Sequence, residues 1–318
     1  MSKLVGFDGK FDNLVLVIIF IAVFPSASLQ SAGPIATIVN YIWPPALFSY
    51  WLITDKKFIL NQQDKVSASV GLIFLVFSVF NEGLAVVLFL YLIIRLVIEK
   101  KDFLNPYRIG CSLISLLSII NILICPGNHK RALSEMATWF PKFNHLSLFD
   151  KILIQLNNIS SNLIVHHYIL FGLLLILLLL KAVQNKEILP IVLSGIAIAL
   201  VTIVEKTISK GFGLIYDESS SRTFHINVTK TLFQPSLIFL IILILIATTI
   251  FFLYGKSKTS LIFIGSLAVT FASAMATCLS PTLIASSDRP MLFLYFVIIF
   301  ASAFLANDLI NLNQEEIE

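Results

Sequence analysis

The sequence predicts an all-α protein, a polytopic bundle of about ten transmembrane helices. Hydrophobic residues make up 58% of the 318 residues and charged residues only 13%, whereas soluble domains are nearer half apolar and about a quarter charged. The mean hydropathy is +0.93. The apolar residues come in blocks of about 15 to 23, the length that a helix needs to cross about 30 Å of hydrocarbon. Because runs such as 170–180 do not alternate, the pattern does not suit a membrane β-barrel.

The third and fourth apolar blocks are short and are predicted to form a hairpin. As one helix, residues 66–98 would be about 50 Å long, which is too long for one crossing. The tip of the hairpin is Asn81-Glu82-Gly83. The candidate spans are residues 13–29, 36–54, 66–80, 84–98, 107–125, 162–180, 188–205, 232–254, 260–279 and 290–306.

The basic residues orient these spans. Lysines and arginines are enriched in short cytoplasmic loops, and four short loops carry them. With these loops inside, both termini are cytoplasmic, the chain 1–318 is one multi-pass membrane domain, and the long loops 126–160 and 206–231 lie outside. The basic clusters are Lys56/Lys57/Lys65, Lys100/Lys101/Arg108, Lys181/Lys186 and Lys256/Lys258.

The two outer loops differ in pattern. In loop 126–160, Leu148, Ile152 and Leu156 recur at helical spacing with polar residues beside them, which predicts a helix lying in the membrane interface. Loop 206–231 contains Gly211, Gly213 and several serines, which predicts an irregular lid or crossing loop.

Charge and motifs exclude several classes of function. The net charge is +4, and no block of like charge is long enough to indicate a nucleic-acid partner. Cys111, Cys125 and Cys278 have neither metal-ligand spacing nor a disulfide pattern. No glycine-rich phosphate loop or dinucleotide motif occurs, so no cofactor is evident, and the need for a divalent metal stays open. An enzyme that lacks these motifs and acts on the outer face needs a donor substrate that reaches this face without a soluble nucleotide.

The unusual polar residues gather on the predicted outer side. Short helices hold Glu82 at or below the outer interface, where burial would raise the pKa of its carboxyl toward that of a general base. The alternative is that Asn81 and Glu82 only form a polar turn. Asn128, His129 and Arg131 follow the fifth span and suit a lipid phosphate, or only ordinary headgroups.

Two further outer sites are predicted near the second and last spans. Asp288 and Arg289 precede the last span, where they either pair to cap that helix or contact a phosphate or sugar. Asn40 and Trp43 lie in the outer part of the second span, as interface anchors or as a platform for a sugar ring. Adjacent His166 and His167 point in different directions on a helix, which argues against a shared metal.

Taken as an ordered set, these motifs resemble a known group. Asn40-Tyr41-x-Trp43-Pro44, Asn81-Glu82, Pro126-Gly127-Asn128-x-x-Arg131 and Ser280-Pro281 with Arg289 resemble bacterial polytopic glucosyltransferase-like membrane proteins of surface-polysaccharide and serotype-conversion loci. That group is similar to the GT-C superfamily of membrane glycosyltransferases. The resemblance covers roughly residues 30–290.

The resemblance implies a membrane glycosyltransferase. It would move a sugar from a polyprenyl-phosphate donor in the membrane lipid to a cell-envelope glycan acceptor on the outer face. Glu82 would then be the base, Asp288 a second carboxylate, and Arg131 and Arg289 phosphate contacts. The chain departs from the GT-C pattern because residues 25–40, in the first outer loop, contain no acidic residue.

Two other classes of function remain open on the sequence. A transporter or flippase of a lipid-linked or small polar substrate would place ionisable residues or broken helices near the bilayer midplane, where this sequence shows mostly Leu, Ile, Val and Phe. A non-catalytic partner in an envelope-assembly complex agrees with the missing acidic residue of the first outer loop.

Overall fold

The computed structural model describes residues 18–19, 38–59, 64–98, 105–219, 224–284, 286 and 288–315. Regular structure in these residues is helical and includes no strand, which confirms the predicted all-α class. The chain divides into two compact units. The described part of the first unit lies within residues 38–130, and that of the second comprises residues 131–315 together with 18–19.

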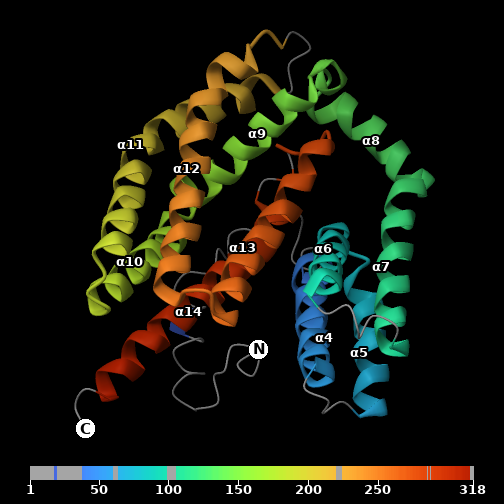
Figure 1. Ribbon diagram of the computed structural model, residues 1–318. Coiled ribbons are helices and arrows are strands. Elements are labelled where there is room, and N and C mark those ends of the chain that lie inside the picture. The colour runs from blue at the N-terminus through green and yellow to red at the C-terminus, as the bar shows by residue number, and fades with distance from the viewer. Residues whose placement is uncertain are drawn as a thin grey trace. The chain divides into compact units, whose positions relative to one another are not determined.

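The described part of the first unit contains η2, the packed helices α4 to α7 and the start of α8 (Figure 1). Its elements are the π-helix η2 (Ile38–Ile42), α4 (Trp43–Ile59), α5 (Lys65–Ser78), α6 (Glu82–Ile98) and α7 (Pro106–Ile124). The helix α8 (Pro126–Trp139) begins in the first unit and ends in the second.

The second unit is a larger bundle with several short helical segments. Its elements are η4 (Phe143–His145), α9 (Leu148–Ser161), the π-helix η5 (Asn162–His166), α10 (Tyr168–Gln184), α11 (Ile188–Ser219), α12 (Val228–Tyr254), α13 (Lys258–Ala276), η6 (Thr277–Leu279), η7 (Arg289–Met291) and α14 (Leu292–Glu315).

The described residues of the predicted spans from 36–54 onward are mainly helical, but the span 162–180 contains a break at His167 between η5 and α10. The span 13–29 lies outside the described residues apart from 18 and 19. Among the described residues, 5 helices are long and apolar enough to cross a membrane, and up to 6 if the bent pair α9–η5 and α10 forms one span. The helix α5 has 14 residues and is only about 21 Å long. The prediction of about ten spans is therefore not confirmed. The five helices that meet these criteria are 106–124, 188–219, 228–254, 258–279 and 289–310.

The first unit packs around large side chains from α4, α5 and α6. Trp51, Leu75 and Leu88 are fully buried. Helices α4 and α5 approach closely because Gly71 has no side chain: a Cβ there would lie 2.9 Å from Cγ2 of Thr54. The turn between α5 and α6 begins at Val79, and Asn81 accepts a hydrogen bond from the backbone N–H of Leu84 to cap α6. The predicted hairpin tip is thus a turn in the structure.

The second unit is held together by pairs of neighbouring helices, which run antiparallel for α11 and α12 and parallel for α10 and α14. The helices α11 and α12 pack side by side, as do α10 and α14 (Figure 1). At the closest approach of α11 to α12, a Cβ on Gly211 would lie 3.1 Å from Cδ2 of Leu232. Gly211 thus allows α11 and α12 to pack closely at this point.

Both segments that the sequence predicts as long outer loops contain more helix than expected. The predicted irregular loop 206–231 is helical to Ser219, because α11 continues to that residue. In the segment 126–160, Pro126 ends α7 and then occupies the first position of α8, where a proline costs no hydrogen bond. The predicted helix around Leu148–Leu156 is α9, but its residues from Leu153 to Ser161 are buried by protein.

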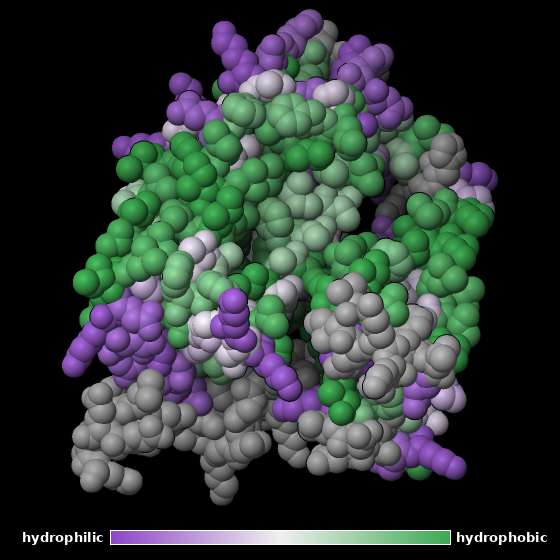
Figure 2. Space-filling model, viewed as in Figure 1, coloured by the Kyte–Doolittle hydropathy of each residue, from purple (hydrophilic) through white to green (hydrophobic). Residues whose placement is uncertain are grey.

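The hydrophilic residues of the second unit gather at its two ends, and a hydrophobic belt lies between them over α10, α11 and α12 (Figure 2). The α10–α11 and α12–α13 turns lie at one end, and the α11–α12 connection lies at the other (Figure 1). This arrangement groups Lys181, Lys186, Lys256 and Lys258, as the predicted topology requires.

Candidate functional site

The chain breaks sharply at His167, between α9–η5 and α10. The two helical segments meet at an angle of 83°, and the backbone N–H of His167 donates to the carbonyl of Asn162 at 2.8 Å. The residues Asn162–His166 form a π-helical turn, a feature that often marks functional positions. The break leaves the His167 side chain at the junction of two helices.

At this break His167 meets Asp288, which lies 121 residues further along the chain. The Nε2 atom of His167 lies 3.0 Å from Oδ2 of Asp288, and the side chains are 16% and 9% exposed. The ring of Tyr295 packs edge-on against the imidazole, with centroids 5.0 Å apart. A carboxylate beside Nε2 favours a proton there, which leaves Nδ1 as an acceptor.

Buried amides of α9 hold the segment that carries Asp288. The Gln155 side chain donates to the carbonyl of Ala274 at 2.8 Å, and the Asn158 side chain donates to that of Leu283 at 2.9 Å. The Asn157 side chain donates to the carbonyl of Leu232 at 3.2 Å. Because each bond joins α9 to a different part of the second unit, α9 fixes the segment 274–283 that leads to Asp288.

The arrangement has the parts of a general base. A histidine that is oriented by a carboxylate accepts protons from hydroxyl groups when its free nitrogen reaches them. Since the His167 side chain is partly exposed, a ligand can approach it. A predicted site residue, Asp288, is therefore part of a defined cluster with His167.

Arg289 follows Asp288 directly, at the start of η7. Its Nε–H donates to the carbonyl of Ser286 at 3.2 Å, which holds the guanidinium close to the chain segment of Asp288. The predicted phosphate contact and the predicted carboxylate are thus neighbours in the same short loop.

The predicted residues of the first unit form a second group. The Asn81 side chain donates to the carbonyl of Asn40 at 2.8 Å, so two predicted binding residues are in contact. Glu82 begins α6 and is exposed rather than buried. A carboxylate in the first turn of a helix is stabilised by the helix dipole. Trp43 is 59% exposed, as expected of an interface anchor.

The predicted residues Asn128, His129 and Arg131 lie on the backbone of α8. Their side chains are outside the described part of the structure. Their roles therefore stay predictions.

Among the described residues, the most deeply buried ion pair lies in the first unit and is not among the sequence-predicted sites. Nη1 of Arg108 lies 2.6 Å from Oδ1 of Asp55, with the side chains 4% and 1% exposed. The hydroxyl of Tyr91 donates to Oδ2 of the same carboxylate. The ring of Phe58 lies 5.0 Å from the guanidinium of Arg108, a cation–π distance.

A second ionic cluster joins three helices of the second unit. The Lys181 ammonium lies 2.8 Å from Oδ2 of Asp308, and the Tyr254 hydroxyl donates to the same oxygen at 2.9 Å. The side chain of Gln184 donates to the carbonyl of Leu309 at 3.1 Å. This cluster ties α10, α12 and α14 together at the end of the unit opposite the α11–α12 connection.

The sequence indicates these two ionic clusters only weakly. Asp55 stands beside Lys56 and Lys57 at the end of an apolar run, a setting typical of a solvated loop. Its partner Arg108 belongs to another basic cluster 53 residues away. Only the packing of α4 against the start of α7 shows that the two charges neutralise each other.

No group of three or more histidine, cysteine, aspartate or glutamate side chains suited to a metal occurs in the described part of the chain. The fold is that of an all-helical protein with several helices suited to membrane spans. No protein-family model, curated protein or solved structure matches the chain.

Proposed function

We propose that the protein is a multi-pass membrane glycosyltransferase that moves a sugar from a polyprenyl-phosphate donor to a cell-envelope glycan on the outer face. The observation that carries the proposal is the pairing of His167 with Asp288 at 3.0 Å, next to Arg289. Asp288 orients His167 as a base, and Arg289, the next residue in the chain after Asp288, supplies a guanidinium for the donor phosphate.

The position of the pair suits a donor held in lipid. The helix α10 begins one residue after His167 and has 17 residues, a length of about 25 Å. When α10 crosses the hydrocarbon core, His167 lies near one boundary of that core. In the predicted topology this boundary is the outer one, where a polyprenyl-phosphate headgroup lies.

The bend at His167 also suits such a site. A helix at 83° to a membrane-crossing α10 runs along the membrane surface. The amide side chains of α9 donate to backbone carbonyls of α12, α13 and Leu283. The residues of α9 from Leu153 to Ser161 are therefore buried against protein rather than lipid.

The reaction needs one base and one leaving-group contact. The acceptor hydroxyl oxygen forms a bond to the anomeric carbon of the sugar, and the bond from that carbon to the donor phosphate oxygen breaks. The electron pair of the broken bond goes to the phosphate, which leaves as polyprenyl phosphate. The hydroxyl proton moves to Nδ1 of His167, while Asp288 stabilises the resulting imidazolium and Arg289 contacts the phosphate.

Glu82 is the base that the family resemblance implies. It is exposed in the first turn of α6, in contact range of solvent and headgroups. Glu82→Gln tests this alternative base separately from His167 and Asp288.

The test uses purified full-length protein in nanodiscs with lipid extract from the host strain, and measures release of polyprenyl phosphate by mass spectrometry. Asp288→Asn and His167→Gln are compared with Asp217→Asn, an exposed carboxylate on α11. Release that is lost in the first two and kept in the third supports the proposal. Equal release in all three would refute the assigned base.

Transport of a lipid-linked or small polar substrate is the second candidate, and one observation favours it. Transporters place ionisable residues at breaks in membrane helices, and His167 stands at such a break. Flipping of a fluorescent lipid-linked sugar in proteoliposomes, abolished by His167→Gln and accompanied by no change in the lipid-linked substrate, would favour transport over transfer.

A further inference from the structure

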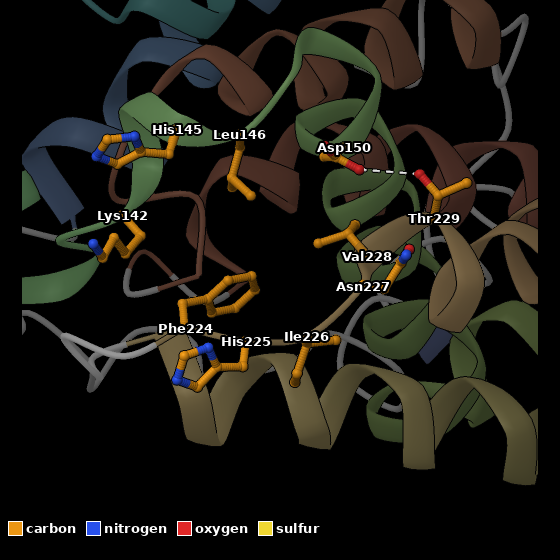
Figure 3. A pocket seen from close by; sticks show the side chains of 10 residues that line it. All are labelled: Lys142, His145, Leu146, Asp150, Phe224, His225, Ile226, Asn227, Val228 and Thr229. Carbon is orange, nitrogen blue, oxygen red and sulfur yellow. Dashed lines mark hydrogen bonds between the residues drawn. The ribbon is translucent and has the colours of Figure 1, made fainter.

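A cavity of about 700 Å³ opens in the second unit between the start of α9 and the start of α12. Its lining comes from the η4–α9 connection on one side and from residues 224–229 on the other (Figure 3). The site is separate from the His167 pair, because α9 and η5 extend for about 25 Å between Asp150 and His167. The lining residues are Lys142, His145, Leu146, Asp150, Phe224, His225, Ile226, Asn227, Val228 and Thr229.

The basic and acidic side chains of this cavity lie on different sides. Lys142, His145 and His225 lie toward one side, and Asp150 with Thr229 lies toward the other (Figure 3). In the described part of the chain, the side chains of the three basic residues make no hydrogen bond or ion pair. Their hydrogen-bond donors therefore remain for a ligand.

The one carboxylate in the lining is already engaged. Oδ2 of Asp150 accepts from the backbone N–H and hydroxyl of Ser147, at 3.2 and 2.7 Å, and Oδ1 accepts from the Thr229 hydroxyl at 3.1 Å. The last bond ties α9 to α12 and closes that wall of the cavity. Because both carboxylate oxygens of Asp150 accept these hydrogen bonds, Asp150 does not compete with a ligand for the basic side chains.

The basic side of the cavity is supported by packed aromatic side chains. Phe224 packs against the ring of Phe140, with centroids 5.3 Å apart, beside a buried cluster that includes Phe143, Ile154 and Val228. The backbone N–H of His225 donates to Oε2 of Glu218 at 3.3 Å. The positions from which Lys142, His145 and His225 extend are thus set by packing rather than by the ligand.

We propose that this cavity binds an organic phosphate, and that Lys142, His145 and His225 contact its phosphate group. Ammonium and imidazole N–H groups are strong donors to phosphate oxygens. The apolar surfaces of Leu146, Phe224 and Ile226 contact the organic part, as in most ligand sites. A phosphorylated sugar and a phospholipid headgroup share this chemistry.

The test is a binding measurement on the purified full-length protein in neutral detergent. Glucose 1-phosphate is titrated by calorimetry, and glucose is titrated in parallel as the uncharged probe. A second arm incorporates the protein in nanodiscs with or without phosphatidic acid and measures retention of that lipid by native mass spectrometry. Each arm compares the native chain with the double variant Lys142→Gln/His225→Gln, the single variant His145→Gln and the control Lys256→Gln, an exposed cation at the opposite end of the unit.

We expect saturable binding of glucose 1-phosphate over glucose, or specific retention of phosphatidic acid, and at least a tenfold weaker affinity in the double variant with an unchanged circular dichroism spectrum. The first arm identifies a soluble phosphorylated ligand, and the second identifies a lipid headgroup. His145→Gln gives the same answer if the double variant does not fold. Failure of both probes to bind, or equal affinity in the variants and in Lys256→Gln, would overturn the proposal.

Discussion

The Nε2 atom of His167 lies 3.0 Å from Oδ2 of Asp288, although 121 residues separate them in the chain. The contact joins a helix break at an angle of 83° to the short loop before the last helix. The two side chains are only 16% and 9% exposed, and buried ionisable groups are costly unless they are paired or functional. We therefore infer the function of the protein chiefly from this pair.

The first prediction concerns the base. Asp288→Asn keeps the size of the side chain but removes the charge that orients His167 and stabilises its protonated form. We expect transfer to fall by at least about 100-fold, the usual contribution of a general base, with little change in helical content. The measurement is the initial rate of polyprenyl-phosphate release, with Asp217→Asn as the matched control. A rate within twofold of the native chain would contradict the role of Asp288.

The second prediction concerns Glu82. Because the side chain is exposed, Glu82→Gln should change the free energy of unfolding by no more than about 0.5 kcal/mol. If Glu82 is the base that the resemblance implies, the same variant abolishes transfer while the protein stays inserted. Thermal unfolding followed by circular dichroism and the release assay measure the two effects. Full activity in a folded Glu82→Gln protein would remove Glu82 from the mechanism.

The third prediction concerns the buried pair of Asp55 and Arg108. Removing one member leaves an uncompensated buried charge, which costs about 3–5 kcal/mol. Asp55→Asn should therefore lower the thermal midpoint strongly. The double variant Asp55→Leu/Arg108→Met replaces both charges by apolar groups and should recover most of the loss. A double variant as unstable as Asp55→Asn would show that the charges themselves are required.

The fourth prediction concerns the amides of α9. Asn158→Ala removes the bond to the carbonyl of Leu283 and leaves that buried acceptor unpaired, at a cost of about 1–3 kcal/mol. Transfer should fall as well, because the segment that leads to Asp288 loses one of its contacts. Asn144→Ala, at an exposed asparagine of η4, is the control. Equal unfolding midpoints for the two variants would refute the role of Asn158.

The fifth prediction concerns sidedness. In a chain without its native cysteines, Asp217→Cys should react with a membrane-impermeant maleimide in intact cells, because it precedes the predicted outer connection. Lys256→Cys should react only after the cells are permeabilised, because it lies in a predicted cytoplasmic turn. The reverse labelling would invert the predicted topology of the second unit.

Several features of the fold followed from the sequence for simple reasons. The apolar blocks predicted the positions of α10, α12, α13 and α14, because long hydrophobic runs form helices when water is excluded. The polar turn between α5 and α6 also followed from the short length of each apolar block. The helical course of residues 206–219 did not follow, since Gly211 is accommodated by close packing against Leu232, which local composition does not encode.

The candidate site followed from the sequence only in part. Asp288 and Arg289 stood out because charges before an apolar span are unusual. The pairing of Asp288 with His167 depends on a helix break and on hydrogen bonds that the side-chain amides of Gln155 and Asn158 donate to distant backbone carbonyls. Such contacts across more than a hundred residues arise from packing alone. The same reason accounts for the missed pair of Asp55 and Arg108.

The most direct test of the central claim is mass spectrometry of envelope glycans and lipid-linked intermediates from strains with the gene, without it, and with Asp288→Asn. A strain carrying Asp217→Asn serves as the control. If the protein transfers a sugar, we expect one sugar to be lost from the glycans in the deletion and Asp288→Asn strains, while its polyprenyl-phosphate donor accumulates. Unchanged glycans and unchanged donor levels in all strains would contradict glycosyl transfer.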